Sequence, residues 1–247
     1  MSNEQRIVEK LVIGPKTPEP SVRVLITARH HACEMMASYV LEGIIESILN
    51  DPELEYLKEH VEFMIIPFMD KDGVENGDQG KNRLPRDHNR DYEGHSIYAS
   101  TAALRKDIPG WSDGKLKIAL DLHCPWIHGA YHERIHLVGK PNPDIETEQV
   151  LFSELLEKHA TGELPFRSED FLPFGTDWNT GNNNTKGASF SRWAETIEEI
   201  YLATTIEFPY GNVLGVPVSI RNAREFGKAI AFSMQEYLTG KQDPICY

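Results

Sequence analysis

The chain has 247 residues, 40% of them hydrophobic and 26% charged, which is typical of a folded globular protein and excludes a mainly disordered one. Lysine and arginine number 25 against 38 aspartates and glutamates, so the formal net charge is −13, which argues against nucleic acid or an anionic membrane as a partner. No apolar run approaches the roughly 18 residues of a membrane span, and three cysteines are too few for a disulfide scaffold, so a cytoplasmic protein is expected.

Strand and helix patterns alternate along the chain. In chain order the expected elements are strands at 6–13 and 21–28, a helix at 33–49, a strand at 61–67, a helix at 100–108, strands at 115–122 and 135–138, helices at 145–160 and 196–199, a strand at 204–208 and a helix at 219–238. This alternation predicts an α/β fold with a mixed, mostly parallel central sheet flanked by helices. We expect a single domain over 1–247, in which 1–20 form an N-terminal strand and turn.

Ionisable side chains follow three of the predicted strands. His31 and Glu34 come after the second strand, His123 comes after the fourth, and Glu207 lies near the end of the sixth. In open α/β sheets, ligands bind beyond the carboxyl ends of the strands. Residues i and i+3 at a helix start lie on the same side, so His31 and Glu34 can chelate one ion. With His123 they would supply the three protein ligands of a catalytic zinc site.

Each of these signals also has a simpler explanation. An H-x-x-E pair occurs by chance in many helices, and Asp121 and His123 share one face of a strand, so they could simply pair with each other. His128, His132 and His136 would align on a helix, but their segment lacks a helical apolar pattern. We therefore expect these three histidines at the surface or at the rim of a cleft.

Five short segments resemble motifs of the zinc metallocarboxypeptidases, especially the cytosolic carboxypeptidase branch. They are residues 28–34 (ARHHACE), 70–74 (DKDGV), 87–90 (DHNR), 121–123 (DLH) and 205–207 (TIE). Their order and approximate spacing agree with that family from residue 21 to about residue 210. The resemblance implies a zinc-dependent carboxypeptidase that binds one zinc ion through His31, Glu34 and His123. It also implies that Asp87 hydrogen-bonds His31 and thereby orients the imidazole.

The same resemblance implies the residues that act on the substrate. Asn89 and Arg90 would bind its terminal carboxylate, and Glu207 would be the general base. A cation is also needed to stabilise the developing charge on the scissile carbonyl. Arg83 and Arg86 both lie in the segment where the family carries this arginine, and we favour Arg83. The expected substrate is a peptide or an acyl-amino acid with a free carboxylate.

Specificity and reaction type leave alternatives open. Arg192 lies fifteen residues before Glu207, near the family's pocket floor, where it would favour an acidic terminal residue; alternatively it is a surface arginine on a helix. The N-acyl amino acid deacylases of the succinylglutamate desuccinylase and aspartoacylase type carry similar H-x-x-E and D-L-H motifs, so deacylation is the second hypothesis. A non-catalytic carboxylate-binding module is the third. The sequence indicates no oligomeric state.

Overall fold

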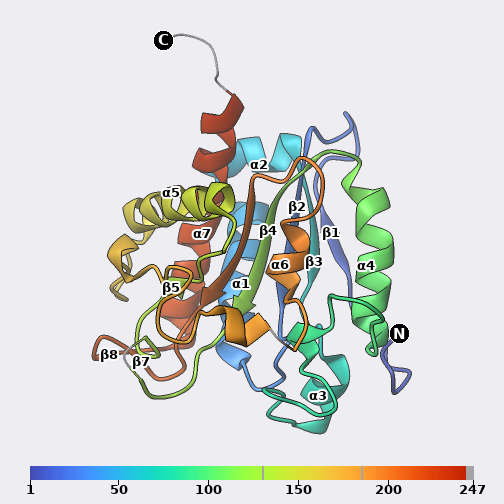
Figure 1. The fold of residues 1–247 in the computed structure, drawn as a ribbon. Coiled ribbons are helices and arrows are strands. Elements are labelled where there is room, and N and C mark those ends of the chain that lie inside the picture. The colour runs from blue at the N-terminus through green and yellow to red at the C-terminus, as the bar shows by residue number, and fades with distance from the viewer. Residues whose placement is uncertain (130, 185, 243–247) are drawn as a thin grey trace.

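The computed structural model describes residues 1–129, 131–184 and 186–242. Six strands form one sheet in the order β1-β3-β2-β4-β6-β5 (Figure 1). They are β1 (Leu11–Ile13), β2 (Val22–Ala28), β3 (Val61–Ile66), β4 (Leu116–His123), β5 (His136–Leu137) and β6 (Leu202–Glu207). The four central strands are parallel, whereas β1 and β5 pair antiparallel at the two edges. The predicted α/β fold with a mixed, mostly parallel sheet is thereby confirmed.

Helices cover both faces of this sheet (Figure 1). One face packs against α1 (Met35–Asn50), α2 (Glu55–His60), α5 (Pro143–His159) and α7 (Ile220–Gln242), and the other packs against α4 (Ala99–Ser112) and α6 (Phe190–Ala194). Side chains of a strand alternate between the two layers. In β2, Val24 and Ile26 join the first core and Leu25 joins the second. Burial on both faces explains why the central strands read as continuous apolar runs.

Helices α1 and α7 pack closely because glycines lie at their crossing. A Cβ atom on Gly43 would lie 2.1 Å from the backbone oxygen of Arg224, a distance that backbone atoms cannot accommodate. An ion pair between Arg224 and Glu42 joins the same two helices.

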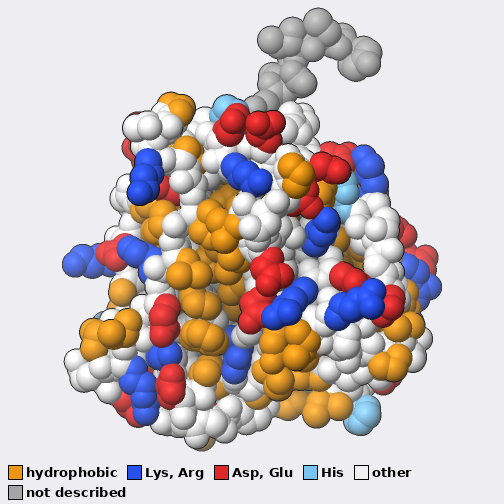
Figure 2. Space-filling model, turned by 180° about the vertical axis from the view of Figure 1, so that it is seen from behind, with side chains coloured by type: hydrophobic (Ala, Val, Ile, Leu, Met, Phe, Trp, Pro, Cys, Tyr) orange, Lys and Arg blue, Asp and Glu red, His pale blue; other side chains and the backbone are white. Residues whose placement is uncertain are grey.

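Seen from behind, the molecule carries Lys and Arg side chains intermixed with Asp and Glu, with hydrophobic side chains between them (Figure 2). Among the described residues, no helix combines the length and apolar character needed to cross a membrane.

Several predicted elements differ from the structure. The first strand begins only at Leu11, because the chain before it is tied to α3 (Lys71–Asn76) by an ion pair between Arg6 and Asp72. The predicted helix at 196–199 is wrong, since these residues form turns. The helix in this region is α6, which begins after Ser189, whose side chain caps the amide of Arg192.

Besides α6, three short elements were not predicted: α2, α3, and the hairpin of β7 (Asn212–Val213) with β8 (Val216–Pro217). The predicted rim position of His136 is also wrong, because this residue lies in β5 and is fully buried. Its ring is covered because β5 closes the edge of the sheet beside β6. An edge strand of only two residues leaves too short a pattern to distinguish a buried side chain from a rim side chain.

The parallel register brings three strand ends to one edge of the sheet. Ala28 at the end of β2 is opposite Leu122 in β4, and His123 is opposite Glu207 at the end of β6. Residues directly after β2 therefore lie beside the ends of β4 and β6. This edge is where the candidate functional residues meet.

Candidate active site

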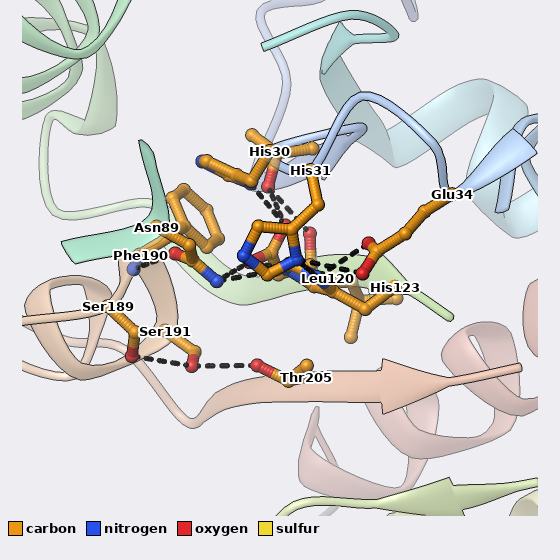
Figure 3. Close-up of polar contacts among 12 residues, drawn as sticks. His30, His31, Glu34, Asn89, Leu120, His123, Ser189, Phe190, Ser191 and Thr205 are labelled. Carbon is orange, nitrogen blue, oxygen red and sulfur yellow. Dashed lines mark hydrogen bonds and ion pairs between the residues drawn. The ribbon is translucent and has the colours of Figure 1, made fainter. Parts of the chain in front are cut away.

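His31, Glu34 and His123 converge at this edge, and their side chains point toward one another (Figure 3). The Nδ1 atom of His31 lies 2.8 Å from Oε1 of Glu34, and Nδ1 of His123 lies 2.8 Å from Oε2 of the same carboxylate. The two Nδ1 atoms are 3.2 Å apart. Glu34 is fully buried, and His123 is nearly so. The structure thus brings together the three residues that the sequence suggested as metal ligands.

The outer nitrogen of each imidazole faces a carboxylate. Nε2 of His31 lies 3.1 Å from Asp87, and Nε2 of His123 lies 2.7 Å from Asp121. Burial alone would raise the pKa of Asp87, but its hydrogen bond and charge interaction with His31 outweigh burial and hold that pKa below its usual range. These carboxylates fix the orientation of both rings and increase the basicity of the inward-facing nitrogens. The predicted contact between Asp87 and His31 is present.

Asp121 also connects this cluster to a second, deeper histidine. Its other oxygen lies 2.8 Å from Nδ1 of His30 and accepts a hydrogen bond from Thr27. Nε2 of His30 lies 2.7 Å from the hydroxyl of Tyr92, and His30 is fully buried. His30, Asp121 and His123 also lie close enough to hold an ion, but both ring nitrogens of His30 already have protein partners. We therefore assign His30 to the support of Asp121.

The cluster of His31, Glu34 and His123 fits zinc by its chemistry. Two imidazole nitrogens and a carboxylate oxygen are ligands that catalytic zinc sites use, and the ligand atoms of the cluster lie within 4.8 Å of one another. Two facing Nδ1 atoms at 3.2 Å cannot both carry a proton without repulsion, whereas both can donate lone pairs to a cation. Both outer nitrogens are held by carboxylates, which is the arrangement found around zinc-binding histidines.

A cavity of about 560 Å³ opens at this cluster. His31 and His123 line it, and so does Glu207 at the end of β6. The side chain of Glu207 is largely buried, and its Oε2 atom has no hydrogen-bond partner among the described residues. A buried carboxylate oxygen without a hydrogen-bond partner is costly unless a ligand or water meets it. Glu207 is therefore available to act on a molecule bound beside the ligand cluster.

Cationic side chains line the other parts of the cavity. Arg90 follows Asn89 in the loop, Arg192 lies on α6, and Lys140 follows β5. The Lys140 ammonium donates a hydrogen bond to the hydroxyl of Ser191, and the residue is 6% exposed. Burial lowers the pKa of Lys140 to about 8. Within the described part of the chain, no carboxylate pairs with Lys140 or Arg192, so both cations are available to an anionic ligand.

Three residues with predicted roles have contacts that the sequence did not suggest. Arg83 does not line the cavity; its guanidinium donates to Asp70 at 2.5 Å and pairs with Asp78 at 2.9 Å. Arg86 also lies outside the cavity lining and is paired with Asp91 at 2.7 Å. Both arginines are thus paired with carboxylates outside the cavity lining.

Asn89 lines the cavity, but the protein holds both ends of its amide. Its Nδ2 donates to Asp121 at 3.1 Å and lies 2.9 Å from Nε2 of His123, and its Oδ1 accepts from the amide of Phe190. Asn89 is therefore placed to orient His123 and Asp121. That leaves Arg90 as the better-placed partner for a substrate carboxylate.

Sequence reasoning missed Lys81 and Lys140, which both line the cavity. Lys140 follows a predicted strand, so the reasoning that selected His31, His123 and Glu207 could have found it. Lys81 lies inside the long polar segment at 69–92, where no spacing or pattern distinguishes one lysine from its neighbours.

Comparison with known proteins points to one family. The zinc carboxypeptidase family model matches residues 1–112. Cytosolic carboxypeptidase 3 of Bos taurus is 25% identical over 235 residues, which cover 87% of this chain and 21% of that protein. Cytosolic carboxypeptidase 2 of Xenopus tropicalis is 32% identical over 199 residues, covering 76% of this chain and 19% of that protein. The chain thus spans about a fifth of the length of these two relatives.

Solved structures share the fold. A metallo-carboxypeptidase from Burkholderia cenocepacia superposes with a TM-score of 0.76 at 22% identity, covering 97% of this chain and 63% of that one. A succinylglutamate desuccinalase from Vibrio parahaemolyticus superposes with a TM-score of 0.59 at 18% identity, covering 90% of this chain and 69% of that one. The fold is therefore common to peptide hydrolases and a deacylase.

Proposed function

This chain belongs to the zinc carboxypeptidase family, and we propose that it is a zinc-dependent carboxypeptidase, which hydrolyses the C-terminal peptide or amide bond of a substrate with a free carboxylate. The observation that carries the proposal is the convergence of His31, Glu34 and His123 at a cavity that Glu207 also lines. A cytoplasmic site of action belongs to the proposal, because the relatives are named cytosolic carboxypeptidases.

In this proposal each residue of the site has one task. His31, Glu34 and His123 hold one zinc ion, which supplies Lewis acidity toward the scissile carbonyl and a water molecule. Glu207 accepts a proton from the attacking water and later gives it to the leaving amine. Arg90 binds the terminal carboxylate through its planar guanidinium. Asp87 and the other outer partners keep the imidazoles in the tautomer that leaves Nδ1 unprotonated.

The cations in the rest of the cavity support a preference for an acidic terminal residue. If Arg90 binds the terminal carboxylate, Arg192 and Lys140 remain to meet the side chain of that residue. Neither has an ion pair with a carboxylate among the described residues, and Glu195 interacts with both only through space, so an acidic side chain would supply a direct countercharge. We therefore propose that Arg192 and Lys140 select a terminal glutamate or aspartate.

This preference should weaken at alkaline pH. Burial lowers the pKa of Lys140 to about 8; Glu195 and Asp121 act to raise it, and Arg90 and Arg192 act to lower it further. Lys140 is therefore charged below pH 8 and neutral above it. From pH 7 to pH 9 we expect kcat/KM for a glutamate-terminated peptide to fall about tenfold relative to a leucine-terminated one, following the charged fraction of Lys140. The measurement is the ratio of kcat/KM for the glutamate-terminated peptide to kcat/KM for the leucine-terminated peptide, taken at several pH values from 7 to 9.

The control for this prediction is Lys140→Arg, which remains charged throughout the range. In that variant the ratio should be constant from pH 7 to pH 9. If the ratio falls equally in wild type and Lys140→Arg, the loss of preference is caused by the titration of a group other than Lys140, and the prediction is contradicted.

A deacylase remains the second candidate, because the succinylglutamate desuccinalase fold matches 90% of the chain. The test is a panel of peptides that end in glutamate, aspartate, alanine, leucine or lysine, beside N-succinyl and N-acetyl amino acids, with zinc-loaded protein. We expect release of the terminal amino acid, fastest from the acidic peptides. Hydrolysis of the acyl-amino acids alone would indicate the deacylase. Binding of these compounds without hydrolysis would indicate a carboxylate-binding module.

A further inference from the structure

Lys81 is held directly over the ligand cluster by its own loop. Gly80 has a φ of +89°, and a Cβ atom at this position would lie 2.5 Å from the amide nitrogen of Ala32. The neighbouring Gln79 accepts a hydrogen bond at its backbone oxygen from the amide of Cys33. Only glycine allows this close approach in the left-handed region. The loop is thus fixed against the turn that carries His31 and Glu34.

The ammonium of Lys81 contacts this cluster. Its Nζ lies 2.7 Å from Oε1 of Glu34 and donates to the backbone oxygen of Cys124 at 2.5 Å. The ring of Trp126 lies 5.2 Å from Nζ, within the range of a cation–π contact. The side chain is 10% exposed and lines the cavity. An ammonium has three donors, and these contacts use two, so within the described chain one N–H is left for the cavity.

In the part of the chain that the structure describes, the other basic residues discussed above have no ion pair with the ligand cluster. Arg83 and Arg86 lie outside the cavity lining and are bound to carboxylates. Arg192 lies in α6, and Lys140 donates to the hydroxyl of Ser191 in the same helix. Arg90 donates to the backbone oxygen of Asn89. Among the described Lys and Arg residues, Lys81 is the cation with an ion pair to the ligand cluster.

We propose that Lys81 is a catalytic residue that donates a hydrogen bond to the oxygen of the scissile carbonyl as negative charge develops on it. This inference rests on the proposed peptidase function. Water adds to the carbonyl carbon, the carbon–nitrogen bond breaks, and Glu207 carries the proton from the water to the leaving amine. Lys81 loses no proton in this sequence. A fixed cation at a developing oxyanion stabilises the transition state more than the ground state.

The test compares Lys81→Met, Lys81→Gln and Lys81→Arg with wild type on the best peptide of the panel. We expect Lys81→Met and Lys81→Gln to lower kcat by about 10²- to 10³-fold, as loss of an oxyanion donor does elsewhere, with bound zinc unchanged. Lys81→Arg should recover most of the rate, because it restores the charge. Lys106→Met, the same change at an exposed position on α4, should leave kcat and KM as in wild type.

A second measurement separates this role from support of the fold. A phosphonate analogue of the peptide mimics the charged tetrahedral geometry, whereas the product amino acid does not. In Lys81→Gln the affinity for the phosphonate should fall by the same factor as kcat/KM, while the affinity for the product is unchanged. If Lys81→Met does not fold, the test of the catalytic role rests on Lys81→Gln, because glutamine keeps a polar side chain of similar length.

Three outcomes would overturn the inference: kcat within threefold of wild type in Lys81→Gln, equal loss of phosphonate and product affinity, or loss of bound zinc. The last would show that Lys81 serves Glu34 and the metal site. These outcomes are distinguishable from failure of the proposed function, because in that case the wild-type protein itself would not hydrolyse any peptide of the panel.

Discussion

Glu207→Gln is expected to lower kcat for peptide hydrolysis by about 10²- to 10⁴-fold, the usual contribution of a general base, while the protein keeps its zinc. The amide is close in size to the carboxylate but cannot accept a proton from water. Glu207 lines the cavity, and its Oε2 atom is buried without a hydrogen-bond partner among the described residues, so the substitution breaks no hydrogen bond of that atom. Initial rates and metal content by atomic emission are measured on the same preparation.

The control is Glu198→Gln, the same change at an exposed turn just before β6. It should leave both the rate and the metal content as in wild type. Full activity in Glu207→Gln would exclude Glu207 as the base. Loss of zinc in Glu207→Gln would instead place this residue among the metal ligands.

His123→Ala is expected to abolish stoichiometric zinc binding and with it hydrolysis. The substitution removes one of three converging ligands and leaves Asp121 and Glu34 buried with fewer partners. A Lewis acid contributes several kcal/mol to such a reaction, so its loss corresponds to a decrease in kcat/KM of about 10³-fold or more. His95→Ala, at an exposed position, should retain both zinc and activity. One zinc per chain in purified His123→Ala would contradict the ligand assignment.

Chelation of the wild-type protein should have the same effect as His123→Ala, and added zinc should restore activity. Zinc affinity should decrease as the pH falls below neutrality, because both histidines must be deprotonated to bind metal. Activity that survives exhaustive removal of metal would exclude a zinc mechanism. The remaining activity is measured after dialysis against a chelator and again after readdition of zinc.

The positions of the candidate metal ligands and of the candidate general base along the chain were predictable because strand ends are local features. His31 and Glu34 follow a buried apolar run, and His123 and Glu207 end two others. Parallel strands place their carboxyl ends at one edge of a sheet. The alternation of strand and helix patterns thus implied both the fold class and the proximity of these four residues.

The partners of the loop side chains depended on the tertiary structure. Arg83 pairs with Asp70, and the amide of Asn89 is used by Asp121 and Phe190. Lys81 reaches Glu34 because Gly80 packs against Ala32, a contact between residues 48 positions apart. Such contacts depend on how the segment at 69–92 folds onto the sheet edge, and no local periodicity in the sequence indicates this.

By itself the sequence determined which side chains lie at the carboxyl edge of the sheet, because hydrophobic periodicity sets strands, helices and their order. Only the tertiary structure decided which cations face the cavity and which are neutralised by neighbouring carboxylates. The physical reason is that an ion pair of a loop residue is selected by burial and distance in the folded chain, whereas strand placement follows from the pattern of its own residues.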